Sequence, residues 1–262
     1  MTVKIGTALG ASVLALACAA TAFADMETAV VEVKKAREAK DAWGKECAVK
    51  AQHPTEAGNS LARIINEYIN EELGGTYMGD LFDARAMASH YVDECLEPGE
   101  SDADMSADMP PGEERTEIAR LAETGGYVTY EVSTYSFAGG AHGVAGYDGM
   151  TFRRSDGRRM GWDAFVNTGD EGFRNLVKKG LKAYWNVQTD EELAEYLLLE
   201  DDREDDDIPL PQAGPLFTKE GVKLTYQPYE IAAYAAGMPQ FVAPYAELAP
   251  YLTRAAREMV NP

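Results

Sequence analysis

The feature that most constrains the fold is a change to two-residue periodicity near residue 125. From Tyr127 to Phe137, aromatic and β-branched side chains occupy alternating positions, which is typical of a β-strand. A second run, from Gly146 to Arg154, has the same character. The Ser-Asp-Gly-Arg segment at 155–158 that follows it has the composition of a hairpin turn. A chain with long neighbouring strands must build a sheet and cover at least one of its faces.

Other segments have helical periodicity. Apolar residues recur every three or four positions from Leu61 to Leu73, Thr55 is the expected N-cap, and Gly74-Gly75 ends the pattern. Residues 28–50 fit either a helix or two strands. Further helices are expected over residues 81–96, 172–185, 189–199 and 246–260, and further strands over residues 216–226, 229–236 and 241–244.

Strands and helices therefore mix without a regular βαβ rhythm, which predicts an α+β fold. We expect a mixed or antiparallel sheet with flanking helices, in one compact body built from two consecutive α+β subdomains. The predicted parts are a signal peptide over residues 1–24, an N-terminal α+β region over 25–124 and a C-terminal α+β domain over 125–262. An acidic, Pro- and Ser-containing stretch at 97–116 is predicted to be a solvated loop. The acidic run at 200–207 is predicted to be a second one, because it lacks the Gly and Glu of a calcium loop.

The N-terminus has the pattern of an export signal. Lys4 precedes an uncharged stretch that ends in Ala22-Phe23-Ala24, so we expect cleavage after Ala24. The chain is then periplasmic or secreted and has no stable transmembrane segment. Two alternatives stay open, namely an uncleaved membrane anchor and a lipoprotein anchored through Cys18.

Cleavage would leave only Cys47 and Cys95. An oxidising compartment favours a disulfide between them, and the alternative is a pair of buried thiols. No CxxC motif supports a redox or zinc site.

Charge restricts the partners. The chain has 24 Lys and Arg against 44 Asp and Glu, for a formal net charge of −20, which argues against binding to nucleic acid. Loss of Lys4 makes the mature charge −21, and this charge would attract a basic partner.

The first candidate binding feature is the loop formed by Gly139, Gly140, Ala141, His142 and Gly143. Its glycines permit positive φ and a close approach of the backbone, so the loop would present His142 and backbone N–H groups to a ligand. The alternative is a tight crossover in which His142 has a structural role.

The second candidate is the segment from Tyr226 to Gly237, where Tyr226, Tyr229 and Tyr234 accompany Glu230 among small residues. Tyrosines beside a carboxylate suit recognition of a glycan or a protein surface. The alternative is a strand edge whose tyrosines cover the core.

Motifs for catalysis and cofactors are sparse. The sequence has no G-x-S-x-G, H-E-x-x-H, Walker or dinucleotide-binding fingerprint. With three histidines in the chain, a catalytic triad has no supporting motif. We therefore assign no catalytic residue, metal or cofactor.

Three segments taken together resemble one family: Tyr135–Gly143, Asp156-Gly157-Arg158 with Trp162–Phe165, and Pro228–Gly237. They are similar to the extracytoplasmic domain family of the anti-sigma factor RsiV, domain of unknown function 3298. The region of about residues 45–96 resembles its upstream companion, domain of unknown function 4163. The chain departs from the family pattern at Gly161–Phe165 and at Ala233, where the family has a second Pro. No sigma-binding segment precedes the apolar stretch, so we expect no anti-sigma role.

The resemblance implies an envelope role. RsiV-like proteins bind lysozyme outside the cell, and related domains accompany a peptidoglycan deacetylase. We therefore expect an exported, non-catalytic binding protein for lysozyme or a cell-wall component. Its candidate binding residues are Gly139, Gly140, His142, Gly143, Tyr229, Glu230 and Tyr234.

Two alternatives differ in class. One is an envelope-glycan hydrolase or deacetylase that uses His142 and Glu230 as acid and base, which requires His142 near a carboxylate in a cleft. The other is a structural envelope protein.

Overall fold

The computed structural model describes residues 24–39, 43–99, 109–198 and 208–261. The predicted signal peptide up to residue 23, Cys18 and the acidic run at 200–207 lie outside the described residues. A six-stranded sheet forms the larger part of the structure, in the order β1-β2-β3-β4-β5-β6. Its strands are β1 (Thr28–Arg37), β2 (Lys45–Pro54), β3 (Gly112–Glu123), β4 (Tyr127–Phe137), β5 (Val144–Arg153) and β6 (Arg159–Met160).

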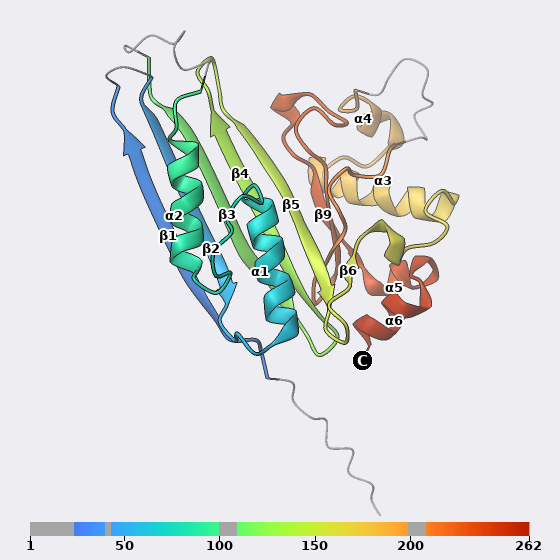
Figure 1. Cartoon of the computed structure of the whole chain (residues 1–262). Helices are drawn as coiled ribbons and strands as arrows, with labels where there is room; N and C mark the ends of the chain where they lie inside the picture. The colour runs from blue at the N-terminus through green and yellow to red at the C-terminus, as the bar shows by residue number, and fades with distance from the viewer. Residues whose placement is uncertain (1–23, 40–42, 100–108, 199–207, 262) are drawn as a thin grey trace, which may run out of the picture.

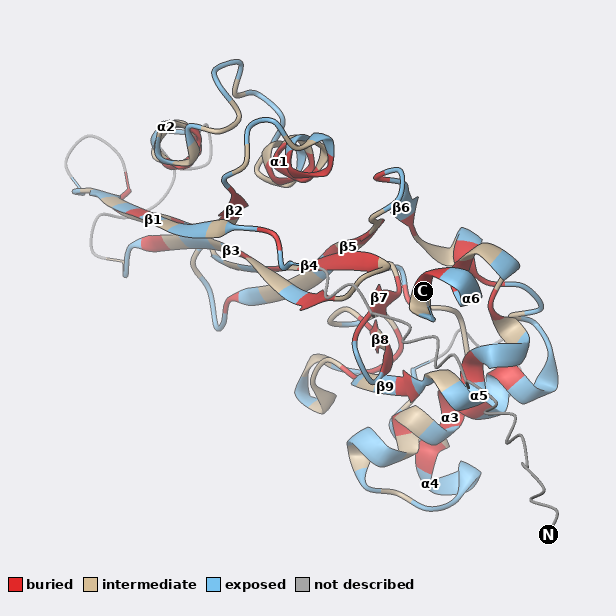
Figure 2. Cartoon of the chain, turned by 90° about the horizontal axis from the view of Figure 1, so that it is seen from below, coloured by how far each residue is buried: buried red, intermediate tan, exposed pale blue. Residues whose placement is uncertain are grey.

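Neighbouring strands are antiparallel except β2 and β3, which are parallel. The parallel pair is connected through two helices, α1 (Ser60–Glu72) and α2 (Ala84–Cys95), which cover one face of the sheet (Figures 1 and 2). Residues 28–50, for which the sequence allowed either structure, contain the paired strands β1 and β2.

A second, three-stranded sheet lies in the part of the chain that follows β6, which we call the C-terminal half (residues 161–198 and 208–261). It consists of β7 (Leu216–Phe217), β8 (Gly221–Thr225) and β9 (Gln240–Pro244). The helices of this half are α3 (Glu171–Trp185), α4 (Asp190–Ala194), α5 (Tyr245–Leu248) and α6 (Arg254–Val260). The α+β prediction is confirmed, with a mixed sheet and flanking helices.

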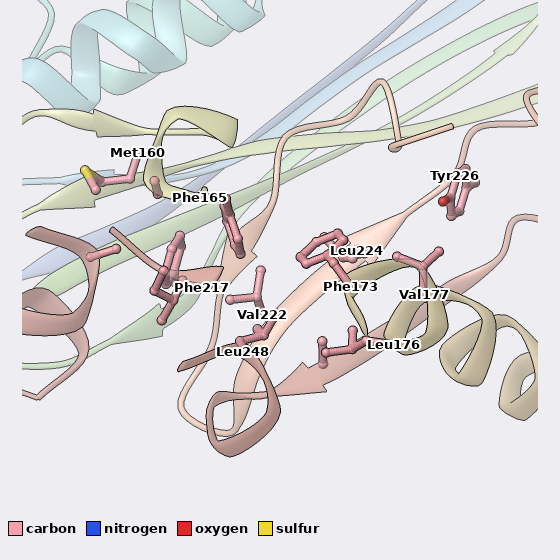
Figure 3. Close-up of a cluster of buried hydrophobic side chains, with 14 of the residues drawn as sticks. Met160, Phe165, Phe173, Leu176, Val177, Phe217, Val222, Leu224, Tyr226 and Leu248 are labelled. Atoms are coloured by element: carbon pink, nitrogen blue, oxygen red, sulfur yellow. The ribbon is translucent and has the colours of Figure 1, made fainter. Parts of the chain in front are cut away.

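Two hydrophobic clusters hold these layers together. The first lies between α1, α2 and the sheet and includes Ile65, Ile69, Met87, Val92 and Phe152. The second is built around β7, β8, α3 and α5 and is shown in Figure 3. Full burial of such side chains contributes about 1.5–3 kcal/mol each.

The six-stranded sheet and the C-terminal half meet where β7 contacts β4 and β5. The Phe217 N–H donates to Thr151 Oγ1 at 3.1 Å, and Thr129 Oγ1 donates to the Phe217 carbonyl at 2.7 Å. All three residues are buried. The predicted border at residue 124/125 falls in the turn between β3 and β4, which are adjacent strands of one sheet.

Several local predictions were wrong. Asn59, not Thr55, caps α1, because its Oδ1 accepts from the N–H groups of Leu61 and Ala62. Thr55 instead donates its N–H to the Glu27 carbonyl and extends the β1–β2 contact. The predicted loop at 97–116 ends early, because β3 begins at Gly112.

In the C-terminal half, residues 229–236 form a turn and a short 3₁₀ helix, Tyr234–Ala236, rather than a strand. The predicted helix 246–260 is divided into α5 and α6 by a 3₁₀ turn at Ala249–Tyr251, where Pro250 lacks an N–H group. The predicted helix 189–199 is also shorter than expected. It stops at Ala194, and Leu197 pairs with Ala232 instead.

The predicted disulfide is confirmed, and it joins Cys47 in β2 to Cys95 at the end of α2. Within the described residues, no helix combines the length and the apolar composition needed to cross a membrane.

Buried His53 predicts a pH-dependent stability. Burial lowers the pKa of His53 below its ordinary value of 6.5, against the opposing effect of the neighbouring Asn66. The folded state therefore binds a proton less readily than the unfolded state. The stability that this supplies is complete above pH 6.5 and is lost as the pH falls below it, by at most about 1.4 kcal/mol per pH unit.

Chemical denaturation between pH 7.5 and 5 checks this expectation. The variant His53→Gln should flatten the pH dependence of the free energy of unfolding. Equal slopes in the wild type and His53→Gln would contradict the assignment.

Candidate functional site

Three aromatic side chains from the two predicted segments lie next to one another at the surface, and we call this group the aromatic ladder: His142, Tyr234 and Tyr229. The rings of His142 and Tyr234 are stacked, with centroids 4.2 Å apart and an interplanar angle of 17°. The rings of Tyr234 and Tyr229 follow at 5.6 Å and 31°. The structure thus brings together residues that are about ninety positions apart in the chain.

The connection between β4 and β5 supplies His142. Gly139 and Gly140 have φ values of 84° and 100°, a backbone conformation that favours glycine. The Gly143 carbonyl accepts two hydrogen bonds, from Tyr234 OH at 2.9 Å and from His142 Nδ1 at 3.0 Å. The second bond requires the proton on Nδ1, because a carbonyl can only accept. These bonds fix the orientation of both rings.

Gly143 lies close against the end of a tyrosine side chain. A Cβ at this position would lie 2.5 Å from the ring and hydroxyl of Tyr135. Tyr135 in turn lies under the Arg115 guanidinium, 5.1 Å from the ring centroid, in cation–π geometry. The base of the ladder is therefore packed against β3 and β4.

A tight turn presents Tyr229. The Glu230 N–H donates to the Gln227 carbonyl at 3.2 Å, and Pro228 occupies the second position of the turn. Tyr229, at the third position, has a φ of 66° and leaves 62% of its surface exposed. Turns with a positive φ at this position normally carry Gly or Asn there, and a bulky residue costs about 1–3 kcal/mol. The sequence thus keeps an exposed tyrosine where glycine would be less strained.

Glu230 stabilises this turn. Its Oε2 accepts from the Gln227 N–H at 2.7 Å, and its Oε1 accepts from the Gln212 N–H at 2.6 Å. Both carboxylate oxygens are thus engaged with backbone groups. Within the described residues, no hydrogen bond or ion pair joins Glu230 to His142.

Gln227 was missed by the sequence analysis. Its side-chain amide pairs with the backbone of Tyr147 in β5, donating through Nε2 to the Tyr147 carbonyl and accepting the Tyr147 N–H at Oε1, at 3.1 Å. This pairing fastens the turn to the sheet edge beside the histidine loop. No local sequence signal predicts it, because the partners lie in separate segments.

Tyr226, the third tyrosine of the segment, is buried and not part of the ladder. Its hydroxyl donates to the Pro209 carbonyl at 2.8 Å, and burial raises the pKa of the phenol. Near the end of the same segment, Trp185, which stacks on Tyr196, donates Nε1–H to the Ala236 carbonyl at 3.0 Å. Tyr226 therefore supports the segment that displays Tyr229 and Tyr234.

The ladder suits binding better than acid–base chemistry. The polar partner of His142 is a backbone carbonyl, and no carboxylate contacts the imidazole within the described residues. In the same part of the chain, no group of three or more His, Cys, Asp or Glu side chains is positioned to hold a metal. An exposed, pre-ordered ring surface is instead the kind of feature that anchors a partner.

Comparison with known proteins gives a family match over part of the chain. Residues 164–246 match the profile of a family described as "Protein of unknown function (DUF3298)". The match includes Tyr229, Glu230 and Tyr234, whereas the histidine loop lies before it. The predicted similarity to domain 3298 is confirmed.

Two solved structures share the fold. A DUF3298 family protein from Pseudomonas aeruginosa superposes with a TM-score of 0.63 at 16% identity, covering 89% of this chain and 97% of the other. A DUF3298 member from Bacteroides fragilis superposes with a TM-score of 0.73 at 18% identity, covering 90% and 98%. A search of curated proteins gave no significant match.

Proposed function

We propose that this chain, which carries a DUF3298 domain at residues 164–246 and the fold of solved DUF3298 proteins, is an exported, non-catalytic binding protein of the cell envelope. Its ligand is a basic protein such as lysozyme or a peptidoglycan-related component, and the binding surface is the aromatic ladder. The single observation that carries the proposal is Tyr229, an exposed ring held in a strained backbone conformation. Strain of this kind persists where a function requires it.

Two further observations support the setting. The Cys47–Cys95 disulfide is expected in an oxidising compartment outside the cytosol. A net charge of −20 favours encounter with a basic protein, since surface charge of opposite sign speeds association.

Replacement of Tyr229 by glycine separates binding from folding. Tyr229→Gly should weaken ligand binding by about tenfold or more, as expected for an aromatic anchor. It should change the free energy of unfolding by less than about 1 kcal/mol, because glycine relieves the positive φ while losing one ring contact. Isothermal titration calorimetry with a basic lysozyme and with soluble peptidoglycan fragments, at about 0.15 M salt, measures the first effect.

The matched control is Tyr196→Ala, which removes another partly exposed tyrosine outside the ladder. It should leave binding unchanged. Absence of heat with both ligands would refute the proposed function. Binding that is lost in Tyr196→Ala and retained in Tyr229→Gly would place the surface elsewhere.

A further inference from the structure

The outer edge of β1 is an unused interaction surface. β1 is the terminal strand of the six-stranded sheet and runs for 10 residues, and no described segment pairs with its outer side (Figure 1). Its side chains include Val30, which is 62% exposed. An edge of this length presents a row of backbone donors and acceptors to any strand that can align with it.

The sequence of β1 is complementary to itself. In an antiparallel pairing of two copies, with the symmetry axis at Val33, each residue faces the one at the same distance on the other side of Val33. Glu32 then lies opposite Lys34 of the second copy, and symmetry produces this pair twice. On the same sheet face, Val30 lies opposite Ala36. Opposite charges and apolar pairs that face each other across strands are stabilising.

Existing contacts leave these groups accessible. Lys34 forms an ion pair with Glu46 at 2.6 Å, yet its side chain is 54% exposed. On the other face of β1, Lys35 contacts Asp93 of α2 at 2.6 Å. In the alignment centred on Val33, Lys35 faces Val31 and no lysine faces a lysine. An axis at Glu32, Lys34 or Lys35 would instead place two identical charges opposite each other.

We propose that the chain forms a two-fold symmetric dimer through β1, with Val33 at the axis and Glu32 paired with Lys34 of the second copy. The two sheets become one continuous sheet across the dimer. Because β1 lies at the opposite side of the sheet from β4 and β5, the two aromatic ladders lie far apart on the outer sides of the dimer. This inference does not depend on what the ladder binds.

Sedimentation equilibrium of the purified protein tests the proposal, from about 1 to 100 µM at about 0.15 M salt. The wild type should reach twice the monomer mass. Glu32→Lys places lysine opposite Lys34 at both symmetric positions, and Lys34→Glu places two carboxylates opposite each other. Each variant should raise the dimer Kd by about tenfold or more, and the double variant Glu32→Lys/Lys34→Glu should restore dimerisation.

Controls separate this effect from charge and folding. Glu195→Lys makes the same change in net charge as Glu32→Lys, at an exposed position in the C-terminal half, and should leave the Kd unchanged. Circular dichroism should show that each variant is folded. A protein that stays monomeric at 100 µM, or a dimer whose Kd is insensitive to both single variants, would overturn the proposal.

Discussion

Replacing Cys47 and Cys95 together with alanine is expected to lower the free energy of unfolding by about 4 kcal/mol. The bridge spans a sequence separation of 48 residues, and cross-linking a segment of this length removes much conformational freedom from the unfolded chain. The loss is large because a domain of this kind is stable by only about 5–15 kcal/mol. Alanine is the appropriate replacement at Cys47, which is 1% exposed.

Equilibrium denaturation under non-reducing conditions measures the effect. The reduced wild-type protein should lose a similar amount of stability, because reduction removes the same cross-link without changing side-chain volume. A double variant within about 1 kcal/mol of the wild type would mean that the unfolded chain gains little freedom when the bridge is absent.

Elements with strong periodicity were predictable from the sequence. The apolar residues of α1 identify it directly, because burial of one face selects the helical period. The alternating aromatic and β-branched residues of β4 identify it as a strand, although its first half is buried on both faces. The start of β3 was missed for a related reason. Near its start, β3 carries the charged residues Glu113, Glu114 and Arg115, which resemble a loop in the sequence. The strand tolerates them because it leaves them at least partly exposed, and Glu114 forms an ion pair with Lys45.

The candidate site was predictable in its parts but not in its arrangement. The histidine loop and the tyrosine segment were both identified, but nothing local indicates that His142 would stack on Tyr234. The same applies to Glu230, whose carboxylate accepts the N–H groups of Gln212 and Gln227. Tertiary pairing decides these roles, and a single sequence does not encode it in a local pattern.

Phe217→Ala is the second variant with a large expected effect, a loss of about 3–5 kcal/mol in the free energy of unfolding. The Phe217 side chain is fully buried, and its ring lies 6.1 Å from that of Tyr127 in β4 and 6.0 Å from that of Phe165. Truncation leaves a cavity at the joint where the C-terminal half meets the large sheet. The control is Phe137→Ala at the partly exposed end of β4, which should cost about 1 kcal/mol or less.

The same variant tests whether the two halves unfold together. β4 and β5 contribute Val128 and Phe152 to the cluster under α1 and α2, and on their other face they hold β7 through Thr129 and Thr151. Weakening the joint should therefore lower the hydrogen-exchange protection of amides in both α1 and α3. If only α3 lost protection in Phe217→Ala, the sheet would be stable without the C-terminal half, and the border at residue 124/125 would not mark the unit that folds.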